Sequence, residues 1–300
     1  MAECIECVLS QTYHNLELII VDDGSTDDTG RITRQFAAGD KRIKLIRQSN
    51  LGPSSARNTG LENARGSYLT FIDADDVISQ DYLEILYILL CETDAEIAAC
   101  TFTRKYHKLG LYNENYVTLD SRGYVADVLY QRLSDNSICG KLFKASLWKN
   151  VRFRDMRYED LEVFPRVCLK SKSVTFTEAR LYFYRTNVDS FINTFSPERF
   201  DSTKAADLIL HHITEAKCDD RLIGAARSRK LAANFNVFLL AYGNPRYIQE
   251  ASQAWDTIKS LRIQCLKDSN VSSKIKIGIV VSLAGPTMLK LFNAIFKISK

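Results

Sequence analysis

The sequence predicts an α/β fold: a Rossmann-like, doubly wound and mostly parallel sheet, followed by a helical C-terminal extension. Over the first hundred residues, apolar runs that end in acidic residues alternate with amphipathic stretches, which is the β-α-β-α order of an open sheet. After about residue 195 the pattern is helical to the end. The 300 residues, 46% hydrophobic and 25% charged, suit one large globular domain plus an appendage. We therefore expect domains at 1–195 and 196–300.

The expected elements follow a regular order. The chain opens inside a helix at residues 2–9, which leaves no room for a strand ahead of it. Residues 16–24 (LELIIVDDG) are an apolar run closed by acids and glycine, which is typical of a buried parallel strand. A proline suited to a first helical turn and a closing glycine predict a helix within 52–66. The other strands are expected at 42–48, 67–73 and 95–102, and the other helices at 25–38 and 79–93.

Acidic residues follow the strand at 67–73, at the edge where open sheets bind ligands. Asp73 and Asp75 form a D-x-D motif, and hard divalent cations such as Mg²⁺ are typically held by one or two carboxylates plus substrate phosphates. A metal there would activate a nucleoside diphosphate as leaving group. The alternative is an exposed acidic turn. We expect Asp76 to cap the following helix.

A second acidic pair, Asp22 and Asp23, follows the strand at 16–24 and precedes Ser25. A carboxylate there can accept hydrogen bonds from a base N–H or from ribose hydroxyl groups. The alternative is a strand-to-helix turn with a good cap. The two acidic motifs lie about fifty residues apart at equivalent edges of neighbouring units, which favours a functional interpretation of both.

A third candidate is the pair Glu159 and Asp160, which follows an arginine-rich stretch and precedes LEVFPRV. A carboxylate in a cleft is what general-base activation of a hydroxyl group requires. Acidic pairs are also common at helix starts, where they complement the helix dipole.

Together these motifs resemble glycosyltransferase family 2. The segments that carry the resemblance, over roughly residues 3–195, are CVLSQTYHNLELIIVDDGSTDDT, NLGPSSARNTGLENARGSYLTFIDADD, CGKLFKASLW, RYEDLEVFPRV and LYFYRTNVDSF. The resemblance implies a GT-A fold and an inverting, nucleotide-sugar-dependent enzyme of the bacterial capsule and exopolysaccharide type. The helical remainder fits the variable C-terminal extension of this group.

The resemblance also implies a nucleotide site with a metal. Asp75 would bind the Mn²⁺ or Mg²⁺ that bridges the diphosphate, and Asp73 would lie beside it near the ribose. Lys141 and Arg185 would face phosphates. The other residues implied for nucleotide binding are Asp22, Asp23, Ser25, Arg57 and Asn58. For Arg57 and Asn58, helix packing and surface charge are an equal alternative.

The implied chemistry is a single displacement. Asp160, with Glu159 beside it, would take a proton from an acceptor hydroxyl group, which attacks the anomeric carbon as the nucleotide diphosphate leaves. The expected donor is a UDP-sugar. The expected acceptor is a saccharide or a lipid-linked saccharide.

The chain departs from the family at its start. The usual first strand, with its turn that flanks the nucleobase, is absent over roughly twenty residues. We expect either that the native chain starts further upstream or that this chain is a truncated and impaired copy. Loss of a central parallel strand would expose the backbone groups and apolar faces of the neighbouring strands. The alternative function is a non-catalytic binding protein. A sugar-1-phosphate nucleotidyltransferase is a weaker alternative, since its glycine-rich N-terminal loop is not visible.

Composition and charge limit the classes of partner and the cellular location that we expect for this chain. The net charge of +4 gives no argument for nucleic acid, and eight scattered cysteines with a single C-x-x-C fit a reducing cytoplasm. No signal peptide and no run of twenty apolar residues is visible. Residues 269–300 contain five lysines and no acidic residue. We expect this tail, at 271–300, either to contact the inner face of the cell membrane peripherally or to pack on the helical domain.

Overall fold

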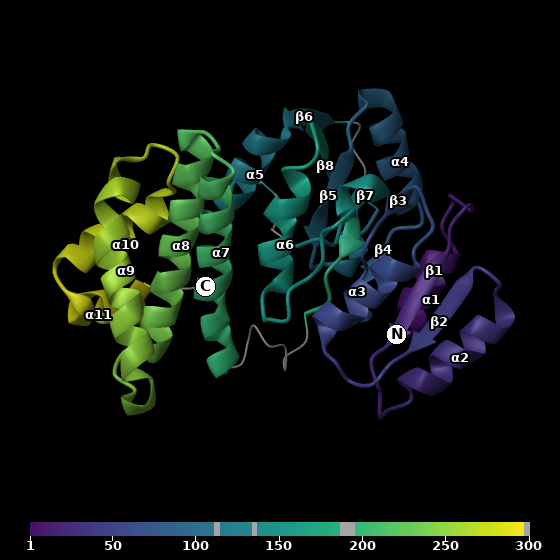
Figure 1. Cartoon of the computed structure of the whole chain (residues 1–300), viewed down its shortest axis with the longest axis horizontal. Helices are drawn as coiled ribbons and strands as arrows, with labels where there is room; N and C mark the ends of the chain where they lie inside the picture. Colours follow the sequence, from purple (N-terminus) through teal and green to yellow (C-terminus); the bar gives the residue numbers. More distant parts are fainter. Residues whose placement is uncertain (111–114, 134–136, 187–195, 297–300) are drawn as a thin grey trace. The chain divides into compact units, whose positions relative to one another are not determined.

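The computed structural model describes residues 1–110, 115–133, 137–186 and 196–296 (Figure 1). The chain divides into two compact units. We call them the sheet unit, residues 1–121 and 136–187, and the helical unit, residues 122–135 and 188–300. A short segment, 122–135, thus joins the helical unit although it lies between two parts of the sheet unit in sequence. The domain boundary expected near residue 195 lies outside the described residues.

The sheet unit begins with helices packed on a small parallel sheet. The elements in chain order are α1 (Ala2–Leu9), β1 (Leu18–Asp22), α2 (Thr29–Gly39), β2 (Ile43–Arg47) and α3 (Pro53–Asn63). Ile5 of α1 packs with Ile20 of β1 and Ile43 of β2 in a small core. Val21 points to the opposite face of β1, where Gly60 lets α3 approach closely. Pro53 begins α3 as the sequence predicts.

The second sheet of this unit has six strands. They are β3 (Tyr68–Leu69), β4 (Val77–Ile78), β5 (Ile97–Thr103), β6 (Tyr116–Asp120), β7 (Lys141–Lys144) and β8 (Ser173–Phe183). The strand order is β3-β7-β5-β8-β4, and β6 pairs with β8. β5 and β8 are parallel, and the other pairs are antiparallel.

β5 and β8 also slip in register. Thr101 lies opposite Arg180, whereas Phe102 lies opposite Tyr182. β8 therefore advances by two residues where β5 advances by one, which is an irregularity of the kind that re-aims side chains.

The predicted α/β class is confirmed, but the sheet is mixed rather than mostly parallel. β1 and β2 form a sheet of their own, and no strand among the described residues pairs with both β1 and β3. Parallel neighbours need helical crossovers, which the alternating pattern supplies only in the first hundred residues. β7 comes from the less regular part of the chain and lies antiparallel between β3 and β5.

Two more α-helices complete the sheet unit, α4 (Tyr82–Thr93) and α6 (Glu159–Cys168). Tyr82, Leu86 and Leu89 are buried on one side of α4, at the spacing of an amphipathic helix. The short 3₁₀ helices of the described chain are η1 (Tyr106–Lys108), η2 (Ala145–Trp148), η3 (Pro197–Phe200) and η4 (Pro245–Tyr247).

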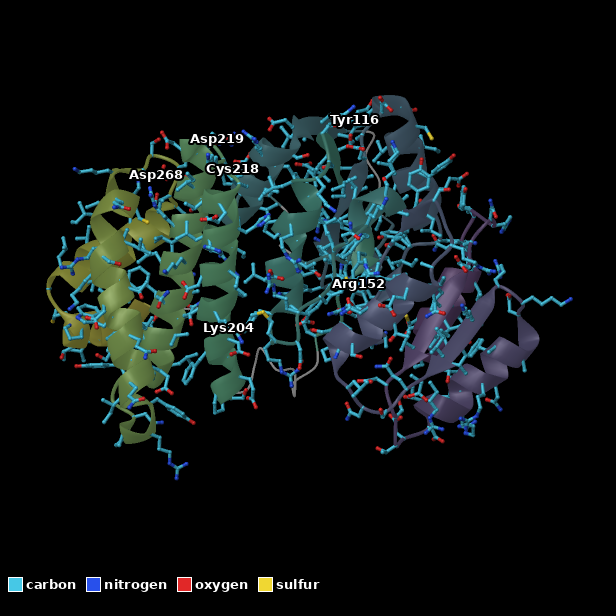
Figure 2. The ribbon with its side chains drawn as sticks, viewed as in Figure 1. Tyr116, Arg152, Lys204, Cys218, Asp219 and Asp268 are labelled. Carbon is cyan, nitrogen blue, oxygen red and sulfur yellow. The ribbon has the colours of Figure 1, made fainter. Side chains whose placement is uncertain are left out.

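The helical unit is built around one central helix. Its helices are α5 (Ser121–Leu129, with Ser121 in the sheet unit), α7 (Asp201–Glu215), α8 (Asp220–Ala241), α9 (Ile248–Lys267), α10 (Ser273–Leu283) and α11 (Pro286–Phe296). α8 packs on both α7 and α9, which explains its buried residues on nearly every side. The Asp219 carboxylate caps α8 by accepting a 3.0 Å hydrogen bond from the Leu222 N–H (Figure 2). The helical pattern expected after about residue 195 is confirmed among the described residues.

All eight cysteines are free. Cys4 and Cys7 both lie on α1, where the Cys7 thiol donates to the Cys4 carbonyl at 3.0 Å. The Cys4 thiol donates to the carbonyl of Asp73 at 3.6 Å, so α1 packs against the D-x-D segment.

Candidate active site

The D-x-D motif lies in a tight turn between β3 and β4. The Asp76 N–H donates a 3.0 Å hydrogen bond to the carbonyl of Asp73 and closes the turn. The turn separates the three carboxylates: Asp75 is exposed, the Asp73 side chain is 39% exposed, and Asp76 is buried. Only Asp73 and Asp75 are therefore accessible to a ligand from solvent.

Arg57 of α3 joins this turn to the start of α6. Its guanidinium donates to the Asp73 carboxylate at 2.9 Å and also pairs with the Glu159 carboxylate. Asp73 lies 16 residues from Arg57 in sequence, and Glu159 lies 102 residues away. The fold thus brings two of the three acidic motifs to one arginine, and we call Arg57, Asp73 and Glu159 the arginine cluster.

Arg57, at the centre of the arginine cluster, keeps its positive charge. Burial of Arg57 opposes its positive charge, but the carboxylates of Asp73, Glu159 and Asp160 outweigh this and raise the pKa of Arg57. The Arg57 guanidinium is therefore charged at every physiological pH. It can offset the negative charges that meet here when an anionic substrate arrives.

Asp160 stands next to the cluster on the first turn of α6. Tyr158, the residue before the helix, has a left-handed backbone (φ 61°), and this sharp turn places Glu159 and Asp160 at the helix start. Carboxylates are favoured there by the helix dipole. The Asp160 carboxylate accepts a 2.7 Å hydrogen bond from the Leu161 N–H. The negative charge of Asp160 also helps to raise the pKa of Arg57.

Asp76 does not cap the following helix, so that expectation was wrong. Asp81 stands at the N-cap position of α4. The Asp76 carboxylate accepts hydrogen bonds from the Tyr182 hydroxyl at 2.7 Å and from the Arg185 N–H at 2.9 Å. Burial raises the pKa of Asp76 to about 6, although these two donors oppose the shift. Asp76 anchors the turn to β8 instead of starting α4.

Arg185, just beyond β8, supports the turn from the other side. Its guanidinium donates to the backbone carbonyl of Asp75 at 2.7 Å and pairs with the Glu3 carboxylate of α1. The side chain is 38% exposed. Arg185 therefore lies beside the D-x-D motif, which is compatible with the expectation that it faces phosphates. Lys141, the other residue of that expectation, lies elsewhere.

Lys141, the other residue expected to face phosphates, is not accessible from solvent. It is fully buried, and its ammonium donates to the backbone carbonyls of Ser137 and Cys139. The rings of Phe102 and Phe164 lie 5.8 and 5.2 Å from the ammonium. Lys141 therefore stabilises the chain ahead of β7 rather than the site.

The first acidic pair lies at the end of β1 and forms a second cluster. Asp22 is buried, accepts a 2.9 Å hydrogen bond from the Ser25 N–H, and lies 3.6 Å from the Arg47 guanidinium. Burial opposes the charge on Asp22, but the hydrogen bonds from Ser25 and the charge of Arg47 outweigh it and lower its pKa. Asp22 and Ser25 thus stabilise the turn after β1.

Asp23 fastens the loop between β2 and α3. It accepts hydrogen bonds from the Leu51 N–H at 2.9 Å, the Gly52 N–H at 2.8 Å and the Gln48 side chain at 2.8 Å. Burial opposes the charge on Asp23, but these three donors outweigh it and lower its pKa. Sequence reasoning missed Gln48, which gives no motif signal.

Gln48 links this second cluster to α3. Its carbonyl oxygen accepts a 2.7 Å hydrogen bond from the Thr59 hydroxyl, two residues after Arg57. Asn58, between them, exchanges two 2.9 Å hydrogen bonds with the backbone of Phe153. α3 therefore connects both acidic clusters and the segment that leads to Glu159.

The accessible carboxylates fit part of a metal site. Among the described residues, no group of three or more histidine, cysteine or acidic side chains could hold an ion alone. Asp75, with Asp73 beside it, matches the sparse protein contribution of Mg²⁺ sites, in which substrate phosphates and water complete the shell. One oxygen of Asp73 is engaged with Arg57.

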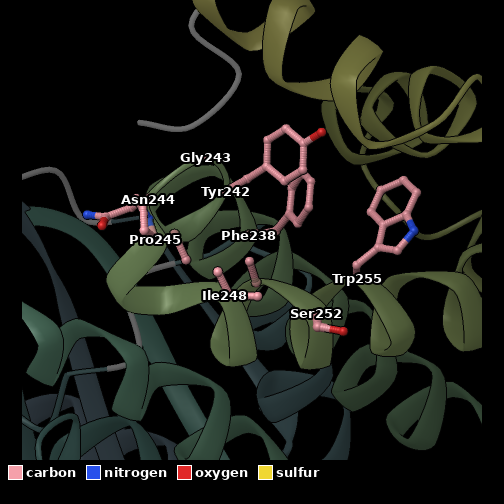
Figure 3. A pocket seen from close by; sticks show the side chains of 10 residues that line it. Phe238, Tyr242, Gly243, Asn244, Pro245, Ile248, Ser252 and Trp255 are labelled. Carbon is pink, nitrogen blue, oxygen red and sulfur yellow. The ribbon is translucent and has the colours of Figure 1, made fainter.

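A separate cavity of about 400 Å³ lies in the helical unit (Figure 3). It is lined by Phe238, Ala241, Tyr242, Gly243, Asn244, Pro245, Ile248, Ala251, Ser252 and Trp255. None of the acidic motifs borders it, and its lining is mostly apolar. The residues that line this cavity therefore include no acidic or basic side chain that could catalyse proton transfer.

Within the part of the chain that the structure describes, no helix has the length and apolar character needed to cross a membrane. The longest, α8, carries charged residues along its course.

Comparison with known proteins agrees with this geometry. Glycosyltransferase GlyA of Streptococcus pneumoniae serotype 4 is 36% identical over 197 residues, which cover 62% of this chain but only 28% of GlyA. Glycosyltransferase GlyG of the same organism is 30% identical over 225 residues, 70% of this chain and 72% of GlyG. The chain thus spans less than a third of the first relative and nearly three quarters of the second.

Solved structures share the fold at low sequence identity. TarS residues 1–349 from S. aureus, in complex with UDP-GlcNAc, match with a TM-score of 0.76 at 18% identity, over 98% of this chain and 87% of that chain. The mannosyltransferase PcManGT from Pyrobaculum calidifontis, in complex with GDP-Man and Mn²⁺, matches with a TM-score of 0.53 at 14% identity, over 98% of this chain and 83% of that chain. These matches establish the GT-A fold.

The family model described as Glycosyl transferase family 2 matches residues 1–152, which is just over half of the 300 residues. The matched part contains α3 with Arg57 and the D-x-D turn, two of the three elements that meet in the arginine cluster. With its fold, its acidic motifs and this match taken together, the chain belongs to glycosyl transferase family 2.

Proposed function

We propose that this glycosyltransferase moves a sugar from a UDP-sugar to a saccharide or lipid-linked acceptor in cell-surface polysaccharide synthesis, with inversion at the anomeric carbon. The observation that carries the proposal is the arginine cluster. It gathers Asp73 and Glu159 from distant parts of the chain around Arg57, with Asp160 next in sequence and Asp75 two residues from Asp73.

Asp160 is the proposed general base. It takes the proton of an acceptor hydroxyl group while the oxygen forms a bond to the anomeric carbon and the bond to the diphosphate breaks. One displacement inverts the centre, and the electron pair leaves with the nucleotide diphosphate. Glu159 is held by Arg57, so its role in this proposal is to position Arg57 and the start of α6.

Asp75 is the proposed metal ligand. A bound Mn²⁺ or Mg²⁺ would neutralise the negative charge that grows on the leaving diphosphate. The exposure of Asp75 and its anchored backbone support this role, because an accessible oxygen on a fixed turn can meet a diphosphate with little reorganisation. Arg57 and Arg185 add fixed positive charges on either side of the turn.

The nucleotide is proposed to bind along the edge formed by Asp22, Asp23 and Ser25, with Arg57 and Asn58 on α3 behind it. TarS binds UDP-GlcNAc and PcManGT binds GDP-Man with Mn²⁺, so a uridine or a guanosine donor is the choice to test. We favour uridine because TarS is the more similar structure.

We place the enzyme at the cytoplasmic side of the cell membrane, with peripheral contact through residues 271–300. The apolar and lysine-bearing composition of this segment supports the contact.

A non-catalytic binding protein is the second candidate. It is favoured by one observation: among the described residues β1 pairs with β2 alone, so the other edge of β1 has no strand partner there.

Release of nucleotide diphosphate separates the two candidates. The protein is incubated with Mn²⁺, UDP- and GDP-sugars and saccharide acceptors, and the released diphosphate is measured. We expect Asp75→Ala to abolish metal-dependent turnover, and Asp160→Asn to lower kcat about a thousandfold while UDP binding is retained. Asp155→Asn, an exposed neighbour ahead of α6, is the matched control. Binding of a nucleotide sugar without any turnover would support the binding protein instead.

A further inference from the structure

The last two helices of the helical unit expose large apolar side chains in a regular pattern. Six such side chains are about half exposed or more: Ile277 50%, Val280 54% and Leu283 50% on α10, and Met288 49%, Leu291 53% and Ile295 72% on α11. Two steps of three residues on α10, and steps of three and four residues on α11, place each trio along one side of its helix. Each helix therefore carries a continuous apolar stripe that faces solvent.

The opposite sides of both helices are packed. Gly278 and Ser282 of α10 are buried, with Gly278 against the ring of Phe235 on α8. The Arg262 side chain of α9 donates a 2.9 Å hydrogen bond to the carbonyl of Ser282. On α11, Leu289 is 1% exposed. The exposed parts of the stripes consequently point away from α8 and α9.

The charged side chains of this segment are of one sign. Residues 269–300 contain lysines and no acidic residue. Lys274 is exposed and Lys276 half-buried, and both precede the stripe of α10 within one turn. The Lys290 ammonium, in contrast, donates to the carbonyl of Leu239 and ties α11 to α8. An apolar surface bordered by lysines complements an anionic lipid surface, while a second copy would place like charges together.

We propose that α10 and α11 dock on an anionic lipid bilayer, with the two stripes in the boundary between headgroups and acyl chains. Lys274 and Lys276 then contact the anionic headgroups. Neither helix is long enough to cross the bilayer, so both lie in its interface. The inference deepens the proposed function, because it assigns the membrane contact to particular residues of the helical unit.

Vesicle co-sedimentation of the full chain tests the docking. We use phosphatidylcholine vesicles with and without phosphatidylglycerol. The stripe variant, Ile277→Ser with Val280→Ser and Leu291→Ser, should lose about tenfold or more of its affinity for anionic vesicles, because binding scales with buried apolar area. The lysine variant, Lys274→Gln with Lys276→Gln, should lose about fivefold per lysine on anionic vesicles and little on neutral ones.

The matched control replaces two equally exposed apolar residues elsewhere. Ile88→Ser with Ile263→Ser changes side chains that are 45% and 47% exposed on α4 and α9, and it should bind vesicles as the unchanged protein does. Far-ultraviolet circular dichroism checks that every variant is folded.

Two results would overturn the docking: failure of the unchanged protein to sediment with anionic vesicles, or unaltered sedimentation of the stripe variant. A dimer seen by light scattering, and lost in the stripe variant without vesicle binding, would assign the stripes to a second copy. Release of UDP with a soluble acceptor should be unchanged in the stripe variant. Loss of that activity in every form of the protein would contradict the proposed function and leave the docking result standing.

Discussion

The hydroxyl group of Tyr182 donates a 2.7 Å hydrogen bond to the buried carboxylate of Asp76. The same oxygen accepts a 3.2 Å hydrogen bond from the N–H of Asp73. One hydroxyl group of β8 therefore holds both ends of the D-x-D turn, and the exposed Asp75 lies between the two held residues.

Removing this hydroxyl should weaken metal use before it destroys the fold. In Tyr182→Phe the Asp76 carboxylate stays buried with one donor fewer, which should lower the free energy of unfolding by about 1–3 kcal/mol. We expect the Mn²⁺ concentration for half-maximal UDP release to rise about tenfold, as for other residues that orient a metal ligand. Tyr116→Phe, at an exposed position of β6, is the control and should match the unchanged protein. A purely structural Tyr182 would lower stability and leave the Mn²⁺ dependence unaltered.

Asp76 should make stability fall as the pH rises. Its pKa is about 6 in the folded chain, against an ordinary value of 3.8, so between about pH 4 and 6 the folded state binds more protons than the unfolded state. The free energy of unfolding therefore decreases through this window, and the loss is complete above about pH 6.

The substitution Asp76→Asn removes the titrating carboxyl group. Between pH 4 and pH 7 we expect the unchanged protein to lose about 1–2 kcal/mol of stability relative to Asp76→Asn, measured by urea unfolding. The exposed Asp94→Asn is the control and should follow the unchanged protein. Parallel stability curves for the unchanged protein and Asp76→Asn would contradict the assignment.

We expect that lysine at position 57 does not restore both the stability and the kcat that Arg57 supports. Arg57→Met leaves the Asp73 and Glu159 carboxylates without their shared partner and should cost about 2 kcal/mol of stability. Arg57→Lys restores a charge but not the planar fork that reaches both carboxylates. We expect it to regain part of the stability while kcat stays low.

The control for this pair of variants is Arg152→Met. Arg152 lies 3.6 Å from Glu62, and both side chains are largely exposed, so its removal should cost less than about 0.5 kcal/mol. Full kcat in Arg57→Lys would show that charge alone suffices in the arginine cluster.

Asp23 should order the loop between β2 and α3. In Asp23→Ala the N–H groups of Leu51 and Gly52 lose their acceptor, which should cost about 1–3 kcal/mol. Hydrogen exchange of these two amides should accelerate more than that of amides in α4. Asp27→Ala, which removes an exposed acceptor of the Thr29 N–H alone, is the control. Unchanged protection of Leu51 and Gly52 would refute the role.

Local sequence patterns were sufficient for the early elements. β1, β2 and α3 are short segments whose ends are marked by acids, glycine or proline, so their positions depend on neighbours in sequence. The same patterns put Asp75 at an accessible strand end. The family resemblance is confirmed by the match over residues 1–152.

The remaining features depend on partners far away in sequence. Asp76 was expected to be a helix cap, but its buried carboxylate accepts a hydrogen bond from Tyr182, 106 residues later. Lys141 is enclosed by Phe102 and Phe164, and no local pattern distinguishes it from an exposed lysine. The mixed sheet likewise depends on where β7 inserts, which side-chain periodicity does not encode. The roles of Asp160 and Asp75 stay predictions until turnover is measured.

The slip in register between β5 and β8 governs how the chain tolerates insertions and deletions. Because of the slip, Tyr182 lies beside Phe102, with their ring centroids 4.9 Å apart, and its hydroxyl reaches Asp76. Successive side chains of a strand point to opposite faces, so deleting one residue of β8 ahead of Tyr182 would turn its ring to the other side. The turn that carries Asp75 would then lose its hydrogen bonds to Tyr182, although no residue of the turn itself had changed.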